Sequence, residues 1–179
     1  MLHPLEPTKY TPLTPKQRFH DYIYQTVGPY TIFRELVLSG FNQGMNSPHE
    51  WGQGASGFAT RFASNMGGVV VHTTITYGLA TAFHEDNRYF ASHQSSKKRR
   101  VLHAALGPFE ARHDDGHFGF SYSNVAGVVG TGFISRLWAP PSWQGAGNIS
   151  RAIGYTFLGE AAFDIFREFL PDLLHHRQD

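Results

Sequence analysis

The sequence predicts a mainly α-helical protein, built as a single-domain bundle of about six helices. Helix start and stop signals flank apolar residues at helical spacing along most of the chain. The 179 residues are 41% hydrophobic and only 16% charged, which is a composition typical of an ordered domain rather than a disordered one. We divide the chain into an extended arm (1–13), a helical domain (14–173) and a polar tail (174–179).

The first two helices are predicted from their ends. Thr14 is the expected N-cap, Pro15 occupies the first helical position and Gln17 completes a capping box. Gly28-Pro29 ends this helix and precedes a second one over roughly 30–42. The second helix places its larger apolar side chains on one stripe: Phe33, Leu36, Val37 and Phe41.

Two later stretches, 55–84 and 120–138, are rich in glycine and nearly free of charge. As helices, they would let another backbone approach closely, and we expect four glycines to serve as packing positions: Gly67, Gly68, Gly127 and Gly130. Residues 62–84 would form a helix of ~34 Å, long enough for a bilayer core. Burial inside a bundle or complex and insertion into, or contact with, a membrane are the two interpretations.

A β-rich membrane barrel is the alternative fold. Residues 69–77 are rich in β-branched side chains, and Phe118 and Phe120 alternate with small residues. Segment 64–70 also resembles segment 123–129, each opening with Ser-Asn. We interpret this similarity as shared helix-start chemistry, with Asn as the N-cap.

The basic run Lys97-Lys98-Arg99-Arg100 begins a short helix that reaches Leu106, and a last helix runs from Asn148 to about Leu170, where Pro171 ends it. The four basic residues are candidates for contact with anionic lipid. Solvated side chains and a bound nucleic-acid phosphate are the alternatives for this run. Because the net charge is only +1, no nucleic-acid partner is predicted.

A polar segment holds the candidate metal ligands: His113, Asp114, Asp115 and His117. Imidazole and carboxylate groups suit zinc or another divalent ion, and a metal-dependent hydrolase is therefore the alternative function. The simpler interpretation of these histidines is a structural or exposed position.

Other chemistry finds little support in the sequence. The chain has no cysteine, which excludes disulfides, thiolate metal sites and cysteine nucleophiles. It also lacks the G-x-S-x-G pattern of a nucleophile elbow. We therefore predict no catalytic residues and no cofactor, and the sequence does not say whether a small molecule binds.

Several short strings together resemble an uncharacterised family of bacterial proteins over about residues 11–173. The strings are Glu50-Trp51-Gly52-Gln53-Gly54, Asp86-Asn87-Arg88-Tyr89-Phe90, Phe120-Ser121-Tyr122-Ser123-Asn124 and Arg167-Glu168-Phe169-Leu170-Pro171-Asp172. The family supplies no activity and no site residues. Its members usually carry an export signal ahead of this region, which implies the cell envelope, whereas this chain opens with no signal peptide.

Together, these observations predict a non-catalytic envelope or membrane-associated packing protein. Its partners would be a membrane or the helices of other chains, either as an oligomer or as a subunit of a larger assembly.

Overall fold

The computed structural model describes residues 10–92 and 94–175, and this part of the chain is mainly α-helical, as predicted. The helices are α1 (Pro15–Val27), α2 (Pro29–Gly44), α3 (Gly54–Ala82), α4 (Lys97–Leu106), α5 (Tyr122–Ile134) and α6 (Ala146–His175). Three short strands, β1 (Glu85–Asp86), β2 (Glu110–His113) and β3 (Phe118–Phe120), form one antiparallel sheet in the order β1-β2-β3. Most of the predicted arm and tail lies outside the described residues.

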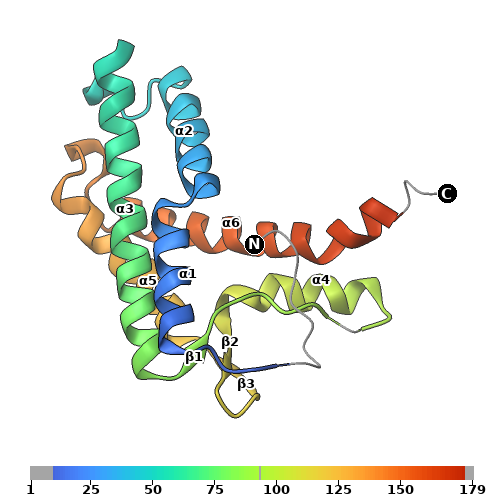
Figure 1. Cartoon of the computed structure of the whole chain (residues 1–179). Helices are drawn as coiled ribbons and strands as arrows, with labels where there is room; N and C mark the ends of the chain where they lie inside the picture. Colours follow the sequence, from blue (N-terminus) through green and yellow to red (C-terminus); the bar gives the residue numbers. More distant parts are fainter. Residues whose placement is uncertain (1–9, 93, 176–179) are drawn as a thin grey trace.

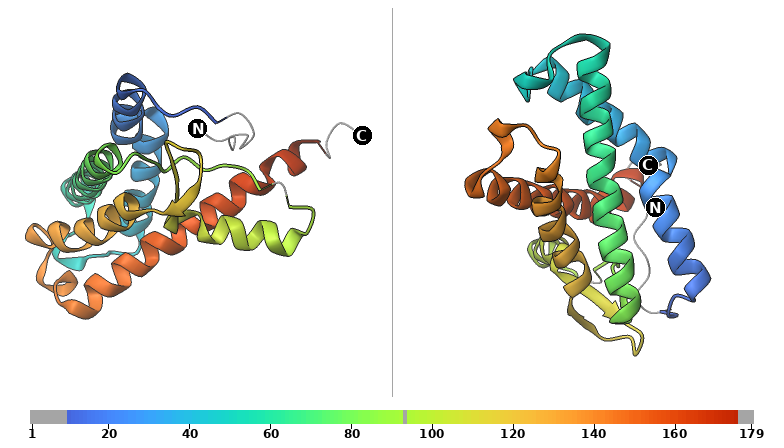
Figure 2. Two further views of the ribbon diagram at one scale, coloured as in Figure 1. Left: turned by 90° about the horizontal axis from the view of Figure 1, so that it is seen from below. Right: turned by 90° about the vertical axis from the view of Figure 1, so that its left-hand side faces the viewer.

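The long helix α3 is the centre of the arrangement (Figure 1). α1 and α2 follow one another along one side of α3, and α5 packs against another side (Figure 2). α6 crosses behind these helices, and α4 lies beside the C-terminal half of α6. The small sheet sits at the end of α3, where β1 directly follows the helix.

The predicted start of α1 is confirmed. The Gln17 backbone N–H donates to Thr14 Oγ1 (3.3 Å), and the Thr14 N–H donates to Gln17 Oε1 (2.9 Å), which is the reciprocal pattern of a capping box. Gly28 then ends α1 and begins α2, with Pro29 at the first position of the second helix. The chain therefore bends between α1 and α2 without a longer loop.

The predicted helix over 120–138 is wrong at both ends. Phe120 belongs to β3 and pairs with Glu110 of β2, because the extended chain before α5 completes the sheet. The Ser121 hydroxyl accepts from the Asn124 N–H (3.1 Å) and caps α5. After Ile134 the chain tightens into a 3-10 turn, Ser135–Leu137.

The other predictions that the structure corrects concern α3 and α6. Residues 69–77 lie inside α3, so the β-rich alternative is wrong there. α6 starts at Ala146, two residues before Asn148, and continues through Pro171. The turn around this proline is held against α4 because Arg100 forms ion pairs with Glu168 (2.8 Å) and Asp172 (2.7 Å).

The prediction that Asn65 and Asn124 are N-caps is wrong. Asn65 lies within α3, and Ser121 caps α5 ahead of Asn124.

The two glycine-rich helices cover each other. A Cβ at Gly127 of α5 would fall on Thr76 Oγ1 of α3, and one at Gly130 would lie 2.8 Å from Ile75 Cδ1. In the opposite direction, a Cβ at Gly68 would lie 3.8 Å from Thr131 Cγ2 of α5. The fourth predicted packing glycine, Gly67, faces the ring of Trp138 at 3.4 Å. The missing side chains thus permit the close approach of α3 and α5.

Charged and polar groups fill much of the interior. Arg61, Glu85, Asp86 and Glu168 are at most 2% exposed. The Arg61 guanidinium donates to the backbone oxygens of Ser47 (2.9 Å), Pro48 (2.8 Å) and Gly52 (2.8 Å). These bonds hold the segment between α2 and α3 against the side of α3, and they satisfy a buried cation with carbonyl dipoles.

Glu85 has a comparable role at the other end of α3. Its carboxylate accepts from the backbone N–H groups of Tyr122 (3.1 Å) and Ser123 (2.9 Å). An anion at this place satisfies unpaired donors and interacts favourably with the N-terminal end of the helix dipole. Glu85 thereby joins the end of α3 to the start of α5.

We expect Gly127→Ala to destabilise the protein by about 1–2 kcal/mol, as measured by urea denaturation. The added Cβ would meet Thr76 Oγ1 and lie 2.7 Å from His72 Cδ2, and overpacking of this kind costs more than the improved helix propensity returns. Gly78→Ala on α3 is the matched control, because a Cβ there meets nothing within 4 Å. Equal effects of the two substitutions would contradict the close α3–α5 contact.

Candidate functional site

α2 buries only polar side chains. From Pro29 to Phe41 the buried residues are Thr31, Glu35 and Ser39, and every other residue is exposed. A spacing of four places these three residues on a single stripe of the helix. α2 is therefore attached to the rest of the protein along a narrow polar seam.

The exposed sides of α1 and α2 carry large apolar side chains. We call this set the α1–α2 surface, and it comprises Phe19, Ile23, Tyr24, Val27, Tyr30, Ile32, Phe33, Leu36, Val37, Leu38, Phe41 and Met45. Phe33 and Phe41 are each 66% exposed. Single apolar residues are normal on a protein surface, but this many on two consecutive helices make the α1–α2 surface a candidate for interaction.

Hydrogen bonds attach both helices to α3. Thr26 Oγ1 of α1 lies 2.8 Å from Thr73 Oγ1 of α3, and both residues are buried. The Asn65 side-chain amide of α3 donates to Ser39 Oγ of α2 (3.0 Å). The polar seam thus replaces the apolar contact that usually joins an amphipathic helix to its domain.

A second polar group lies where α3, α5 and α6 meet. We call His72, Asn124 and Glu160 the Asn124 cluster. The Asn124 side-chain amide donates to Glu160 Oε2 (2.9 Å) and to the Pro108 carbonyl oxygen (2.9 Å), and Asn124 Oδ1 lies 3.3 Å from His72 Nε2. His72 Nε2 and Glu160 Oε1 are 4.0 Å apart, and each side chain is 27% exposed.

Burial controls protonation in this cluster. It raises the pKa of Glu160 to about 7 and lowers the pKa of His72 below its ordinary value. On the next turn of α6, burial raises the pKa of Asp164 to about 6. The positive charge of Arg34 on α2 lowers the pKa of both Glu160 and His72. The cluster can therefore take up a proton near neutral pH.

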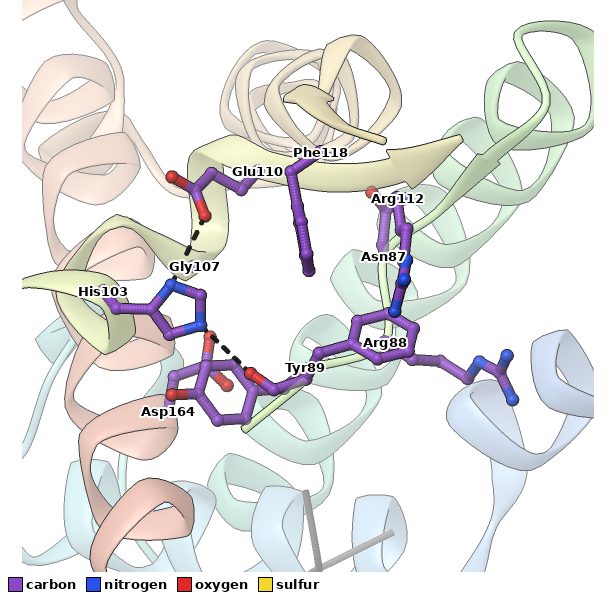
Figure 3. Close-up of a pocket in the computed structure, with 10 residues that line it drawn as sticks. Asn87, Arg88, Tyr89, His103, Gly107, Glu110, Arg112, Phe118 and Asp164 are labelled. Atoms are coloured by element: carbon purple, nitrogen blue, oxygen red, sulfur yellow. Dashed lines mark hydrogen bonds and ion pairs between the residues drawn. The ribbon is translucent and has the colours of Figure 1, made fainter. Parts of the chain in front are cut away.

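The protein has a small cavity between α4, the sheet and α6 (Figure 3). Its volume is about 20 Å³, enough for one water-sized molecule. The groups around it already have partners: His103 Nε2 lies 3.0 Å from the Phe90 carbonyl oxygen, and the Tyr89 hydroxyl donates to Glu168 (2.7 Å). This cavity is too small to hold a substrate.

The candidate metal ligands all lie at the turn between β2 and β3. The rings of His113 and His117 stack at 4.6 Å, and Asp115 bonds to His117. Asp114 instead accepts from Arg18 (3.0 Å) and pairs with His84 (2.8 Å). Within residues 10–92 and 94–175, no three His, Asp or Glu side chains are placed to share a metal ion.

The basic run divides into two parts. Arg100 is held by Glu168 and Asp172 of α6, so it joins α4 to α6. Lys97, Lys98 and Arg99 are exposed in the first turn of α4. Among the described residues, none forms a hydrogen bond or ion pair with these three side chains.

Sequence reasoning missed both the α1–α2 surface and the Asn124 cluster. A signal for the first was present, because Thr31, Glu35 and Ser39 repeat every four residues between mostly apolar neighbours. The cluster joins residues from three distant segments, so no local pattern pointed to it.

Comparison of the chain with models of known protein families, with curated protein sequences and with solved structures gives no match. None of the helices in the described part of the chain is both long enough and apolar enough to cross a membrane. The assignment of function therefore depends on the geometry of these surfaces and clusters.

We expect the protein to lose stability as the pH rises from about 4.5 to 7, with Glu160 contributing roughly 2–3 kcal/mol of the loss. The folded state holds a proton on Glu160 in this range, and the unfolded state has already released it. Glu160→Gln should remove this part of the loss, as measured by urea denaturation at pH 5 and pH 8. His72 contributes to the pH dependence of stability in the opposite direction. Because burial lowers its pKa, the folded state favours the neutral ring, and this stability is lost as the pH falls below about 6.5.

Glu50→Gln is the matched control for this measurement. Hydrogen bonds from Ser142 hold the pKa of Glu50 below its ordinary value, so this substitution should leave the loss between pH 5 and 8 unchanged. If Glu160→Gln also kept the full loss, protonation of the cluster would not be linked to folding.

Proposed function

We propose that the protein is a non-catalytic, membrane-associated packing protein whose α1–α2 surface rests on a lipid bilayer. The observation that carries this proposal is the reversed distribution of side chains on α2, with a polar stripe inside and apolar groups outside. Water is a poor environment for such a surface, and removing the apolar area from water is favourable at roughly 25 cal/mol per Å².

The width of the apolar surface favours lipid over a single partner helix. At 100° per residue, the exposed apolar side chains from Ile32 to Phe41 cover roughly two thirds of the circumference of α2. A partner helix contacts one stripe of side chains. A helix that lies in the headgroup region meets lipid over a wider arc than a single stripe.

The charges on α1 and α2 also suit an anionic lipid surface. Lys16 is exposed, and the Arg34 side chain remains 48% exposed although it pairs with the buried Glu35 at 2.6 Å. Basic residues beside an apolar face are typical of helices that lie in the membrane interface. The members of the family that the sequence resembles usually carry an export signal, and this resemblance would suit a place in the cell envelope.

We expect the double variant Phe33→Asn/Phe41→Asn to bind lipid vesicles at least ten-fold more weakly than the wild type. Both side chains are 66% exposed and far from the polar seam, so the substitutions should remove lipid contact without opening the core. The measurement is flotation with vesicles of phosphatidylcholine and phosphatidylglycerol, and thermal melts would verify that the variant remains folded.

Tyr155→Asn/Leu158→Asn on α6 is the matched control, because these side chains are 70% and 66% exposed. It should bind vesicles like the wild type. The proposal is wrong if the wild type fails to float, or if both variants lose binding equally. A lipid-free dimer broken only by Phe33→Asn/Phe41→Asn would identify a second copy of the chain as the cover.

A further inference from the structure

An open groove is lined mainly by residues of α4 and of the segment before it. α4 itself lies apart from α1 and α2, beside α6 (Figure 1). Its volume is about 420 Å³, within the range of small-molecule sites in proteins. Apolar side chains form most of its wall, and Leu102, Leu106 and Phe118 are 60%, 43% and 45% exposed. Ser92 and Gln94 line the groove beside them.

One end of the groove carries a cationic side chain, and two further basic residues lie nearby in the first turn of α4 without lining the groove. Arg99 lines the groove, and Lys97 and Lys98 precede Arg99 in the same exposed turn. The first turn of α4 contains no acidic residue. Positive charges at a helix N-terminus interact unfavourably with the helix dipole. Among the described residues, no carboxylate pairs with Lys97, Lys98 or Arg99.

Arg99, Leu102 and Leu106 follow one another at spacings of three and four, so they lie along one face of α4. From Arg99 to Leu106 the groove follows α4 for about 10 Å, the rise of seven helical residues. It therefore combines a cationic end with an apolar wall. A ligand that satisfies both features has an anionic head and a single hydrocarbon chain.

We propose that this groove binds a single-chain anionic amphiphile of the fatty-acid class. The carboxylate lies against Arg99, and the chain runs over Leu102 and Leu106 toward Phe118. His103 is held at the wall by its contact with the Phe90 carbonyl oxygen (3.0 Å), which leaves Arg99 as the lining residue with an unpaired charge. The site is separate from the α1–α2 surface and requires no bilayer.

The test is calorimetric titration of the full chain with sodium dodecanoate at pH 8, below its micelle concentration and without vesicles. Dodecanol and inorganic phosphate are the comparison ligands, since each lacks one of the two features. We expect dodecanoate to bind at least ten-fold more tightly than either. Arg99→Gln should weaken dodecanoate about ten-fold and leave dodecanol unchanged, and Leu102→Asn should weaken both.

Two variants on α6 are the matched controls: Arg151→Gln, at an exposed arginine, and Leu158→Asn, at a leucine that is 66% exposed. Both should bind dodecanoate like the wild type, and so should Phe33→Asn/Phe41→Asn, because the α1–α2 surface is not part of the groove. The proposal is overturned if phosphate binds as tightly as dodecanoate, if Arg99→Gln has no effect, or if only Phe33→Asn/Phe41→Asn abolishes binding. The last result would instead assign the ligand to the α1–α2 surface.

Discussion

The side-chain amide of Asn124 is the interaction on which the arrangement of α3, α5 and α6 depends. It donates to Glu160 of α6 and to the Pro108 carbonyl oxygen before β2, and its oxygen faces His72 of α3. One short side chain can reach all three only if the helices approach closely. Gly127, one turn further along α5, permits that approach, because a Cβ there would fall on α3. Gly127 and the Asn124 cluster thus act together. The glycine lets the backbones of α3 and α5 approach, and the Asn124 amide forms hydrogen bonds with the polar groups that this approach buries.

A polar interior has a consequence for the exterior. Hydroxyl, amide and charged groups occupy much of the contact between the helices, so many of the large apolar side chains face outward. On α2 this reversal is nearly complete, because the seam of Thr31, Glu35 and Ser39 is the buried part. Hydrogen bonds give modest net stability when they replace bonds to water, whereas apolar area left in water gives none. On the proposed function, lipid bound to α1 and α2 would therefore stabilise this fold, by the mass action that links any ligand to folding.

The fold class and several helix ends could be predicted from the sequence because their determinants are local. Thr14, Pro15 and Gln17 lie within one turn, and the capping box they form needs no tertiary information. The helix start near 120 was misplaced because Phe120 pairs with Glu110 across the sheet, a contact that no local pattern contains. The candidate surface was also misplaced. Their glycine content and low charge predict a contact surface on α3 and α5, but these two helices cover each other. Many of the exposed apolar side chains lie instead on the shorter helices α1 and α2. The buried face of α1 and of α2 depends on the polar side chains that α3 presents to them. Thr73 of α3 bonds to α1, and Asn65 of α3 bonds to α2.

Arg34 connects the outer surface to the interior. It pairs with Glu35 at 2.6 Å in the polar seam, and its side chain is 48% exposed. After burial and the hydrogen bond to Asn124, its charge is a smaller influence that lowers the pKa of both His72 and Glu160. Water around Arg34 screens this charge, and contact between α2 and a bilayer would remove part of that water. The unscreened charge would then lower the pKa of Glu160 from about 7 toward its ordinary value and favour release of its proton. Because linkage is reciprocal, loss of that proton at higher pH would in turn strengthen the contact between α2 and the bilayer. On the proposed function, the proton on Glu160 and the lipid contact of α2 would thus be coupled through one guanidinium group.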